Sequence, residues 1–130
     1  MRSIFIFSSV VLFSISSFAQ NTIKTMFYNV LEFPELNPNR ISLLEDIVQN
    51  YAPDIFMVCE LQSQEGADTI LNVALNGESG TTNIYSAAPY FENQSGGGDL
   101  QQALFYRNDM FVLENTEIIN PPVRDINKYT

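Results

Sequence analysis

The spacing of apolar and polar positions predicts three elements in the first half of the chain. Residues 22–29, TIKTMFYN, are rich in β-branched and aromatic side chains, which predicts a strand. Residues 38–51 place their apolar side chains on one helical face, and Asn37 and Pro38 suit the N-cap and first position of a helix. Residues 55–59 form a continuous apolar run, which is typical of a strand covered on both faces.

The second half of the chain predicts one more helix and several strands. Apolar residues recur at helical spacing over residues 67–74, and the following Asn76 and Gly77 are typical of a helix end. Strands are predicted over residues 82–87 and 100–107, with a glycine-rich loop between them.

A hairpin is predicted near the end of the chain. Asn108 and Asp109 separate two apolar runs, so residues 103–107 and 110–113 are expected to pair, with a possible extension into Ile118 and Ile119. A further strand-like segment starts at Asp125, which makes the chain look cut short. The predicted order is strand, helix, strand, helix and then several strands. This order predicts a single α/β domain.

The first 19 residues have the pattern of a secretory signal peptide. A positively charged start with Arg2 precedes an apolar run over residues 4–15, and small residues at Ser17 and Ala19 suit a signal peptidase. The alternative, a membrane anchor, is disfavoured because the run is shorter than the roughly 20 residues that span a bilayer. We expect cleavage after Ala19, a folded domain over residues 20–130, and export to the periplasm or the medium without a stable membrane anchor.

The amino-acid composition limits the kinds of catalytic and metal site that this domain can form. The chain has 130 residues with 15 Asp and Glu, 6 Lys and Arg, no His, and one cysteine, Cys59. An intramolecular disulfide, a zinc site of His and Cys, and a Ser-His or Cys-His nucleophile are therefore excluded within these residues. Cys59 lies in the apolar run and is expected to pack as a small hydrophobe. The net charge of −9 and the scattered cations disfavour nucleic acid as a partner.

Two polar residues follow predicted core strands and are the candidate site. Asn29 ends the first strand and Glu60 ends the second, and the helix between them suits a βαβ unit with parallel strands. Both side chains are then expected at the carboxyl edge of the sheet, where α/β folds bind ligands. Glu60 suits Mg²⁺, and Asn29 could donate hydrogen bonds to a phosphate. The plainer alternative is that Asn29 belongs to a turn and Glu60 caps a helix or is solvated.

Three stretches resemble the endonuclease/exonuclease/phosphatase family, which has the deoxyribonuclease-I-like fold. Tyr28-Asn29-Val30 is similar to the family's motif W/Y-N-V/L, and residues 53–60, PDIFMVCE, are similar to P-D-I-hydrophobic-x-x-Q/C-E. Residues 103–111, ALFYRNDMF, resemble its hairpin A-hydrophobic-L-Y-R-x-D-x-F. The resemblance implies a layered α/β sandwich and hydrolysis of phosphodiester or phosphomonoester bonds with Mg²⁺ or Mn²⁺. It makes Glu60 the metal ligand and Asn29 a catalytic residue.

The family's later motifs have no counterpart in this sequence. The catalytic His residues, the G-D-x-N segment and the terminal S-D-H segment are absent, and the family's Tyr near the phosphate could be Tyr85, Tyr90 or Tyr106. The chain is therefore expected to be the N-terminal part of such a domain, inactive by itself, with the inner face of its sheet uncovered.

Relatives act on nucleic acids, sphingomyelin, inositol phosphates and other phosphoesters, so the substrate and the oligomeric state stay open. The alternative from another class is a non-catalytic secreted α/β module for binding or adhesion.

Overall fold

The computed structural model of the protein describes residues 22–77, 83–96, 98 and 100–130. The predicted signal peptide over residues 1–19 lies outside the described residues, as do Thr82 and parts of the glycine-rich loop. No helix within the described ranges is both long and apolar enough to cross a bilayer.

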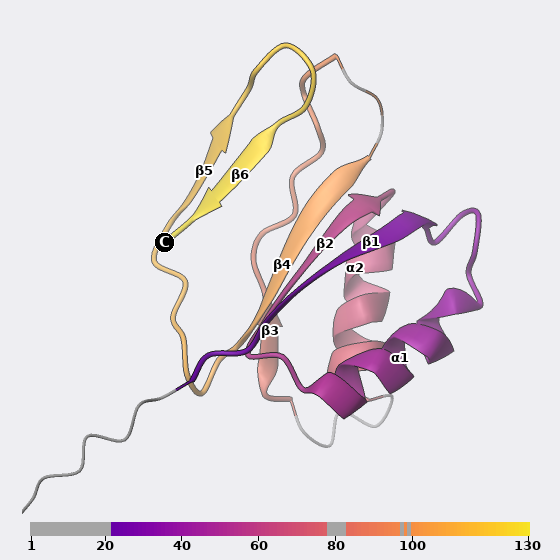
Figure 1. The fold of residues 1–130 in the computed structure, drawn as a ribbon. Helices are drawn as coiled ribbons and strands as arrows, with labels where there is room; N and C mark the ends of the chain where they lie inside the picture. Colours follow the sequence, from indigo (N-terminus) through magenta and orange to yellow (C-terminus); the bar gives the residue numbers. More distant parts are fainter. Residues whose placement is uncertain (1–21, 78–82, 97, 99) are drawn as a thin grey trace, which may run out of the picture.

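A four-stranded sheet with two helical segments on one face forms the body of the molecule (Figure 1). Its strand order is β1-β2-β4-β3, with β1 and β2 parallel and the other pairs antiparallel. The sheet elements are β1 (Thr25–Phe33), β2 (Ile55–Leu61), β3 (Tyr85–Ala87) and β4 (Gln101–Arg107). The helical elements are α1 (Arg40–Tyr51), α2 (Gln64–Thr69) and the π-helical continuation η1 (Ile70–Leu75). The predicted mixed α/β class and the parallel βαβ unit are confirmed.

The core lies between this sheet and the helices. Phe56 and Val58 of β2 and Phe105 of β4 are at most 1% exposed, and the Phe56 and Phe105 rings stack with centroids 6.0 Å apart. From the helices, Leu44 and Ile70 face the same cluster. The amphipathic pattern in the sequence therefore predicted the buried helix faces correctly.

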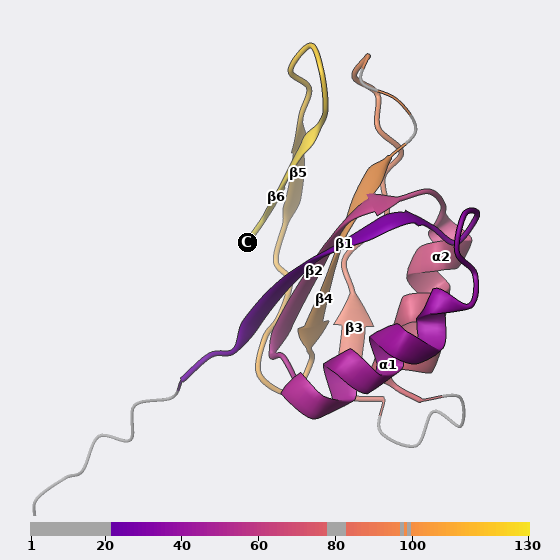
Figure 2. The same ribbon diagram turned by 45° about the vertical axis from the view of Figure 1, so that its right-hand side comes forward.

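The other face of the sheet is covered only in part. Phe27 of β1 is 64% exposed, and Ile55, Met57 and Cys59 of β2 are half-buried. The apolar run is thus fully covered on its helix side and incompletely covered on the other, which we call the open face. A separate hairpin of β5 (Thr116–Ile119) and β6 (Ile126–Tyr129) stands over this side (Figure 2).

A pocket of about 150 Å³ lies between the open face and this hairpin. It is lined by Ile55 and Tyr106 of the sheet, by Phe111 of the segment that follows β4, and by Tyr129 of β6. The pocket is largely apolar, and neither Asn29 nor Glu60 borders it.

The predicted hairpin across Asn108 and Asp109 is wrong. β4 pairs with β2 and β3, while β5 pairs with β6. The backbone N–H groups of Met110 and Phe111 both donate to the Arg107 carbonyl, so the chain makes a wider turn that leads away from the sheet. Both edges of β4 are already occupied, which leaves residues 110–113 no place beside it.

Other element boundaries differ by a few residues. Helix α1 begins at Arg40, two residues after the predicted start, and Asn39 at its N-cap makes no side-chain capping bond. The start of α2 has a true cap, in which the Ser63 hydroxyl accepts from the Gly66 N–H at 3.1 Å. The predicted stop after η1 is confirmed, because Gly77 has a φ of +73°.

Asp125 ties the loop before β4 to the turn between β5 and β6. Its carboxylate is buried and accepts hydrogen bonds from the N–H groups of Gln94 and Ser95, at 2.8 and 3.2 Å, and from the Ser95 hydroxyl. The Asn120 side chain donates to it at 3.1 Å. The Gln94 N–H makes the largest contribution to lowering the pKa of Asp125, followed by the Ser95 hydroxyl, because these donors favour the charged form.

Stability should therefore decrease in acid through Asp125. The pKa of Asp125 is lower in the folded chain than in the unfolded chain, so the ionised carboxylate stabilises the folded state. This stabilisation is complete at pH values above the unfolded pKa of about 3.9, and it is lost as the pH falls through the pKa of the folded chain. We expect Asp125→Asn to lower the melting temperature at pH 7 and to flatten its decrease between pH 5 and 2, measured by circular dichroism. Asp46→Asn is the control, because Asp46 is exposed on α1 and its carboxylate accepts no described hydrogen bond. Equal acid dependence in Asp125→Asn and wild type would contradict the assignment.

Candidate functional site

The carboxyl ends of β1 and β2 carry β-bulges at the two predicted site residues. Asn29 pairs with Cys59, and the next pair in the ladder is Phe33 with Leu61. Four steps along β1 therefore correspond to two along β2. On the other side, Cys59 and Leu61 of β2 pair with the consecutive residues Gln102 and Gln101 of β4. β1 therefore bulges directly after Asn29, over residues 30–32, and β2 bulges at Glu60.

Three non-glycine residues at these bulges have left-handed backbone conformations. Their φ angles are +47° at Leu31, +55° at Glu32 and +59° at Glu60. Such conformations cost of order 1–3 kcal/mol each and tend to cluster at functional sites. The bulges also correct the predicted strand ends. Pairing resumes beyond Asn29 and Glu60 because Phe33 and Leu61, at most 2% exposed, are held in the core.

Asn29 has a fixed side-chain orientation and a free donor group. Its Oδ1 accepts a hydrogen bond from the Leu31 N–H at 2.7 Å, which identifies the oxygen and directs Nδ2 away from that peptide. No acceptor among the described residues contacts Nδ2, and the residue is exposed. Asn29 can therefore donate to an external acceptor without first breaking a bond within the described part of the protein.

Glu60 offers a free carboxylate next to Asn29. The residue is half-buried, and in the described part of the chain no donor contacts its carboxylate. Asn29 and Cys59 are direct partners in the parallel ladder, so their side chains share the open face. The adjacency of the two strand ends is therefore confirmed, whereas joint binding of one ligand by Asn29 and Glu60 stays a prediction.

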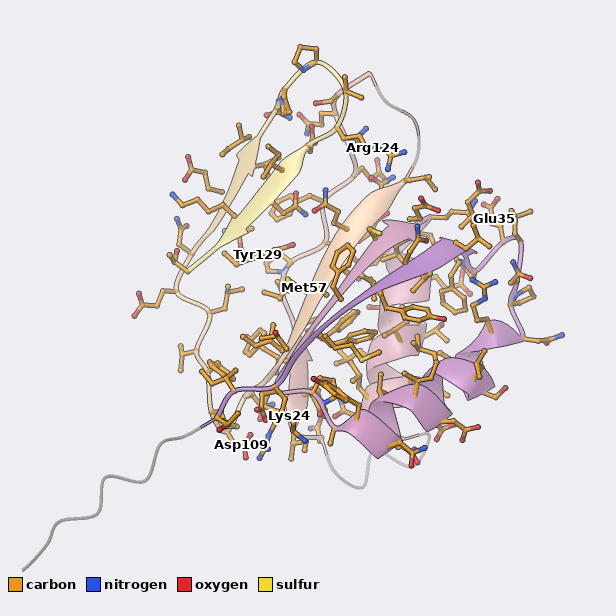
Figure 3. All side chains as sticks on the ribbon, viewed as in Figure 1. Lys24, Glu35, Met57, Asp109, Arg124 and Tyr129 are labelled. Carbon is orange, nitrogen blue, oxygen red and sulfur yellow. The ribbon has the colours of Figure 1, made fainter. Side chains whose placement is uncertain are left out.

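The surroundings of Cys59 disfavour the thiolate form of its side chain. Burial, followed by the negative charge of Glu60, raises the pKa of Cys59, and the positive charge of Arg124 opposes this only in part. Figure 3 shows Arg124 near the carboxyl ends of the parallel strands, on the turn between β5 and β6. Cys59 suits the packing role expected from the sequence.

Two further residues tie the bulged strands together, and the sequence analysis missed them. Past the β2 bulge, the Gln62 N–H donates to the Phe33 carbonyl at 2.9 Å, and the Gln62 side chain accepts from the Glu35 N–H at 2.9 Å. Glu35 lies at this end of the molecule in Figure 3. Nothing in the spacing of Glu35 and Gln62 indicates this contact, because it depends on how far each strand bulges.

The donor set at this edge suits a cation that keeps most of its water ligands better than one that is coordinated by protein side chains alone. Within the described ranges, no three His, Cys, Asp or Glu side chains are grouped as a metal centre. Mg²⁺ keeps several waters and commonly takes one or two protein carboxylates together with substrate phosphate oxygens. The carboxylate of Glu60, which no described donor contacts, fits that mode, and the free Nδ2 of Asn29 suits a phosphate oxygen.

Other residues from the quoted motifs lie at the opposite end of the sheet. Asp54 is 4% exposed, accepts from the Lys24 N–H at 2.8 Å and receives a bond from Arg107 at 3.3 Å. Arg107 also pairs with Asp109 at 2.6 Å. The Tyr85 hydroxyl donates to the Pro53 carbonyl at this same end, at 2.8 Å. These residues stabilise the fold and lie too far along the strands to share a ligand with Asn29 and Glu60.

No family model and no curated protein matches the chain. The chemistry open to Asn29 and Glu60 is therefore inferred from their surroundings in the sheet.

Proposed function

We propose that the carboxyl ends of β1 and β2 form the metal and phosphate site of a divalent-cation-dependent phosphoester hydrolase. The observation that supports this most strongly is the pair of adjacent bulges on neighbouring parallel strands: the β1 bulge directly follows Asn29, and the β2 bulge holds Glu60 in a left-handed conformation. Strain of this kind clusters at binding and catalytic sites. The free carboxylate and the free amide donor at these positions complement a cation and a phosphate.

Each residue has a distinct role in this proposal. Glu60 would hold Mg²⁺ or Mn²⁺ through its carboxylate, and Asn29 would donate from Nδ2 to a phosphate oxygen. When bound, the cation neutralises charge on the phosphate and favours attack by water. The protein contributes a site that is already organised before the substrate binds.

The proposed class is the endonuclease/exonuclease/phosphatase family with its layered sandwich, in an exported protein. The motif resemblance supports the class, and the incompletely covered open face is compatible with a further layer. The substrate would be a phosphodiester or phosphomonoester. A small phosphoester is favoured over nucleic acid because the chain has a net charge of −9.

Turnover by the 130-residue chain is not expected. It contains no His, and a positioned proton-transfer group contributes about 10² to 10⁴ in rate. Binding is therefore the appropriate test. We expect Mn²⁺ to broaden the backbone NMR signals of Asn29 and Glu60 selectively, and dimethyl phosphate with Mg²⁺ to shift the Asn29 side-chain amide signal.

Two results would count against the proposal. Broadening centred on other acidic residues, such as Glu114 or Glu117, would indicate nonspecific cation binding. A folded chain whose Asn29 and Glu60 signals respond to neither ligand would contradict the site itself and would favour a non-catalytic module.

A further inference from the structure

Arg40 contacts the β1 bulge from the first turn of α1. Its Nη1 donates a hydrogen bond to the Val30 carbonyl oxygen at 3.1 Å, and the residue is half-buried. Val30 itself is 1% exposed, so the carbonyl belongs to a residue that is fixed in the core. The contact links the start of the crossover helix to the residue directly after Asn29.

The same peptide group is held from its other side by Asn29. The Val30 carbonyl and the Leu31 N–H belong to one planar peptide, in which the two groups point in opposite directions. Arg40 binds the carbonyl, and Asn29 Oδ1 binds the N–H at 2.7 Å. This peptide leads into Leu31, the first left-handed residue of the bulge. Its orientation therefore decides where the Asn29 side chain lies.

Arg40 and Lys24 are the two cations of the described residues whose side chains donate to a backbone carbonyl. Lys24 donates to the Tyr51 carbonyl, Lys128 pairs with Glu117, and Arg107 pairs with two aspartates. Arg40 makes no ion pair with a described carboxylate, and its side-chain hydrogen bond goes to the Val30 carbonyl of the bulge. A positive side chain placed on a backbone carbonyl in this way serves to orient the peptide.

We infer that Arg40 is a positioning residue that sets the direction of the Asn29 Nδ2 donor toward a bound phosphate, an inference that rests on the proposed function. With Arg40 in place, the peptide between Val30 and Leu31 cannot rotate without losing a hydrogen bond at each end. Oδ1 then stays on the Leu31 N–H, and Nδ2 stays available. Without Arg40, the bulge loses one of these two restraints, and the Asn29 side chain samples other orientations.

An Arg40 variant should therefore lose affinity for phosphate while it keeps its affinity for the cation. Arg40→Met keeps the length of the aliphatic stem and removes the donor, while Arg40→Lys keeps one donor. We expect Arg40→Met to speed hydrogen exchange of the Leu31 amide and to weaken dimethyl phosphate binding in Mg²⁺, each about tenfold. Mg²⁺ binding by Glu60 should change by no more than about twofold, because a single screened charge has little effect.

The control variant is Lys128→Met, which removes the same charge from β6. It should leave both the Leu31 exchange rate and dimethyl phosphate binding unchanged, while Arg40→Lys should restore most of both. Arg40→Gln, whose side chain is too short for this contact, replaces Arg40→Met in the comparison if the latter does not fold.

The outcomes distinguish the inference from the proposed function. Wild-type phosphate binding that persists unchanged in Arg40→Met would overturn the role of Arg40 alone. A loss of phosphate binding that equals the loss of Mg²⁺ binding would indicate a general structural role and would also overturn it. A wild-type chain that binds neither Mg²⁺ nor dimethyl phosphate would overturn the proposed function, and with it the role of Arg40.

Discussion

Glu60→Gln is expected to weaken Mn²⁺ binding by about two orders of magnitude. The substitution keeps the shape of the side chain and removes the carboxylate at the β2 bulge, and a hard divalent cation loses most of its affinity when a charged oxygen ligand becomes an amide. The measurement is a Mn²⁺ titration followed by broadening of the Cys59 and Leu61 amide signals. The melting temperature should change little, because Glu60 makes no described hydrogen bond or ion pair.

Glu45→Gln is the matched control for this effect. It makes the same chemical change on α1, where the Glu45 carboxylate accepts only from the Gln49 side chain at 2.9 Å. Mn²⁺ affinity in Glu45→Gln should equal that of wild type. Undiminished affinity in Glu60→Gln, or an equal loss in both variants, would show that the cation is bound by general negative charge.

A second substitution at Glu60 separates function from stability. Glu60→Gly removes the ligand but also relieves the left-handed conformation at φ +59°, which glycine adopts without strain. We expect this variant to lose Mn²⁺ binding and yet to gain up to about 1 kcal/mol in free energy of unfolding, measured with urea. A loss of stability would indicate that the Glu60 side chain supports the fold.

Phe56→Ala should destabilise the protein by about 3–5 kcal/mol. Phe56 is 0% exposed, stacks on Phe105, and lies between the sheet and both helical segments, so its removal leaves a cavity that the neighbouring strands cannot fill. This loss is a large fraction of the roughly 5–15 kcal/mol that stabilises a domain. Urea unfolding followed by far-ultraviolet circular dichroism measures the change.

Phe27→Ala provides the comparison within the same sheet. Phe27 is 64% exposed on the open face, so its truncation should change the free energy of unfolding by less than about 0.5 kcal/mol. A destabilisation of Phe27→Ala comparable to that of Phe56→Ala would mean that the open face is covered in solution, for example by self-association. The dependence of unfolding on protein concentration would then identify that association.

The regular elements of the first half could be predicted because their signals are local. The β-branched run before Asn29, the one-sided apolar pattern of α1 and the apolar run at 55–59 depend only on side chains close in sequence. The parallel pairing of β1 and β2 follows from the length of the helical connection. The hairpin across Asn108 failed because an apolar pattern does not indicate which strand edges are already occupied.

The sequence by itself determined which residues could carry chemistry at the edge of the sheet. Asn29 and Glu60 stand out because each is polar and follows an apolar strand, and the absence of His restricts the donors to carboxylates and amides. Only the tertiary structure decided how these donors are held. No glycine in the sequence marks the positions of the bulges. The bulges arise because Phe33 and Leu61 must reach the core. The contact of Arg40 with the Val30 carbonyl likewise depends on where α1 packs, since hydrogen bonds between distant segments form only after the chain has folded.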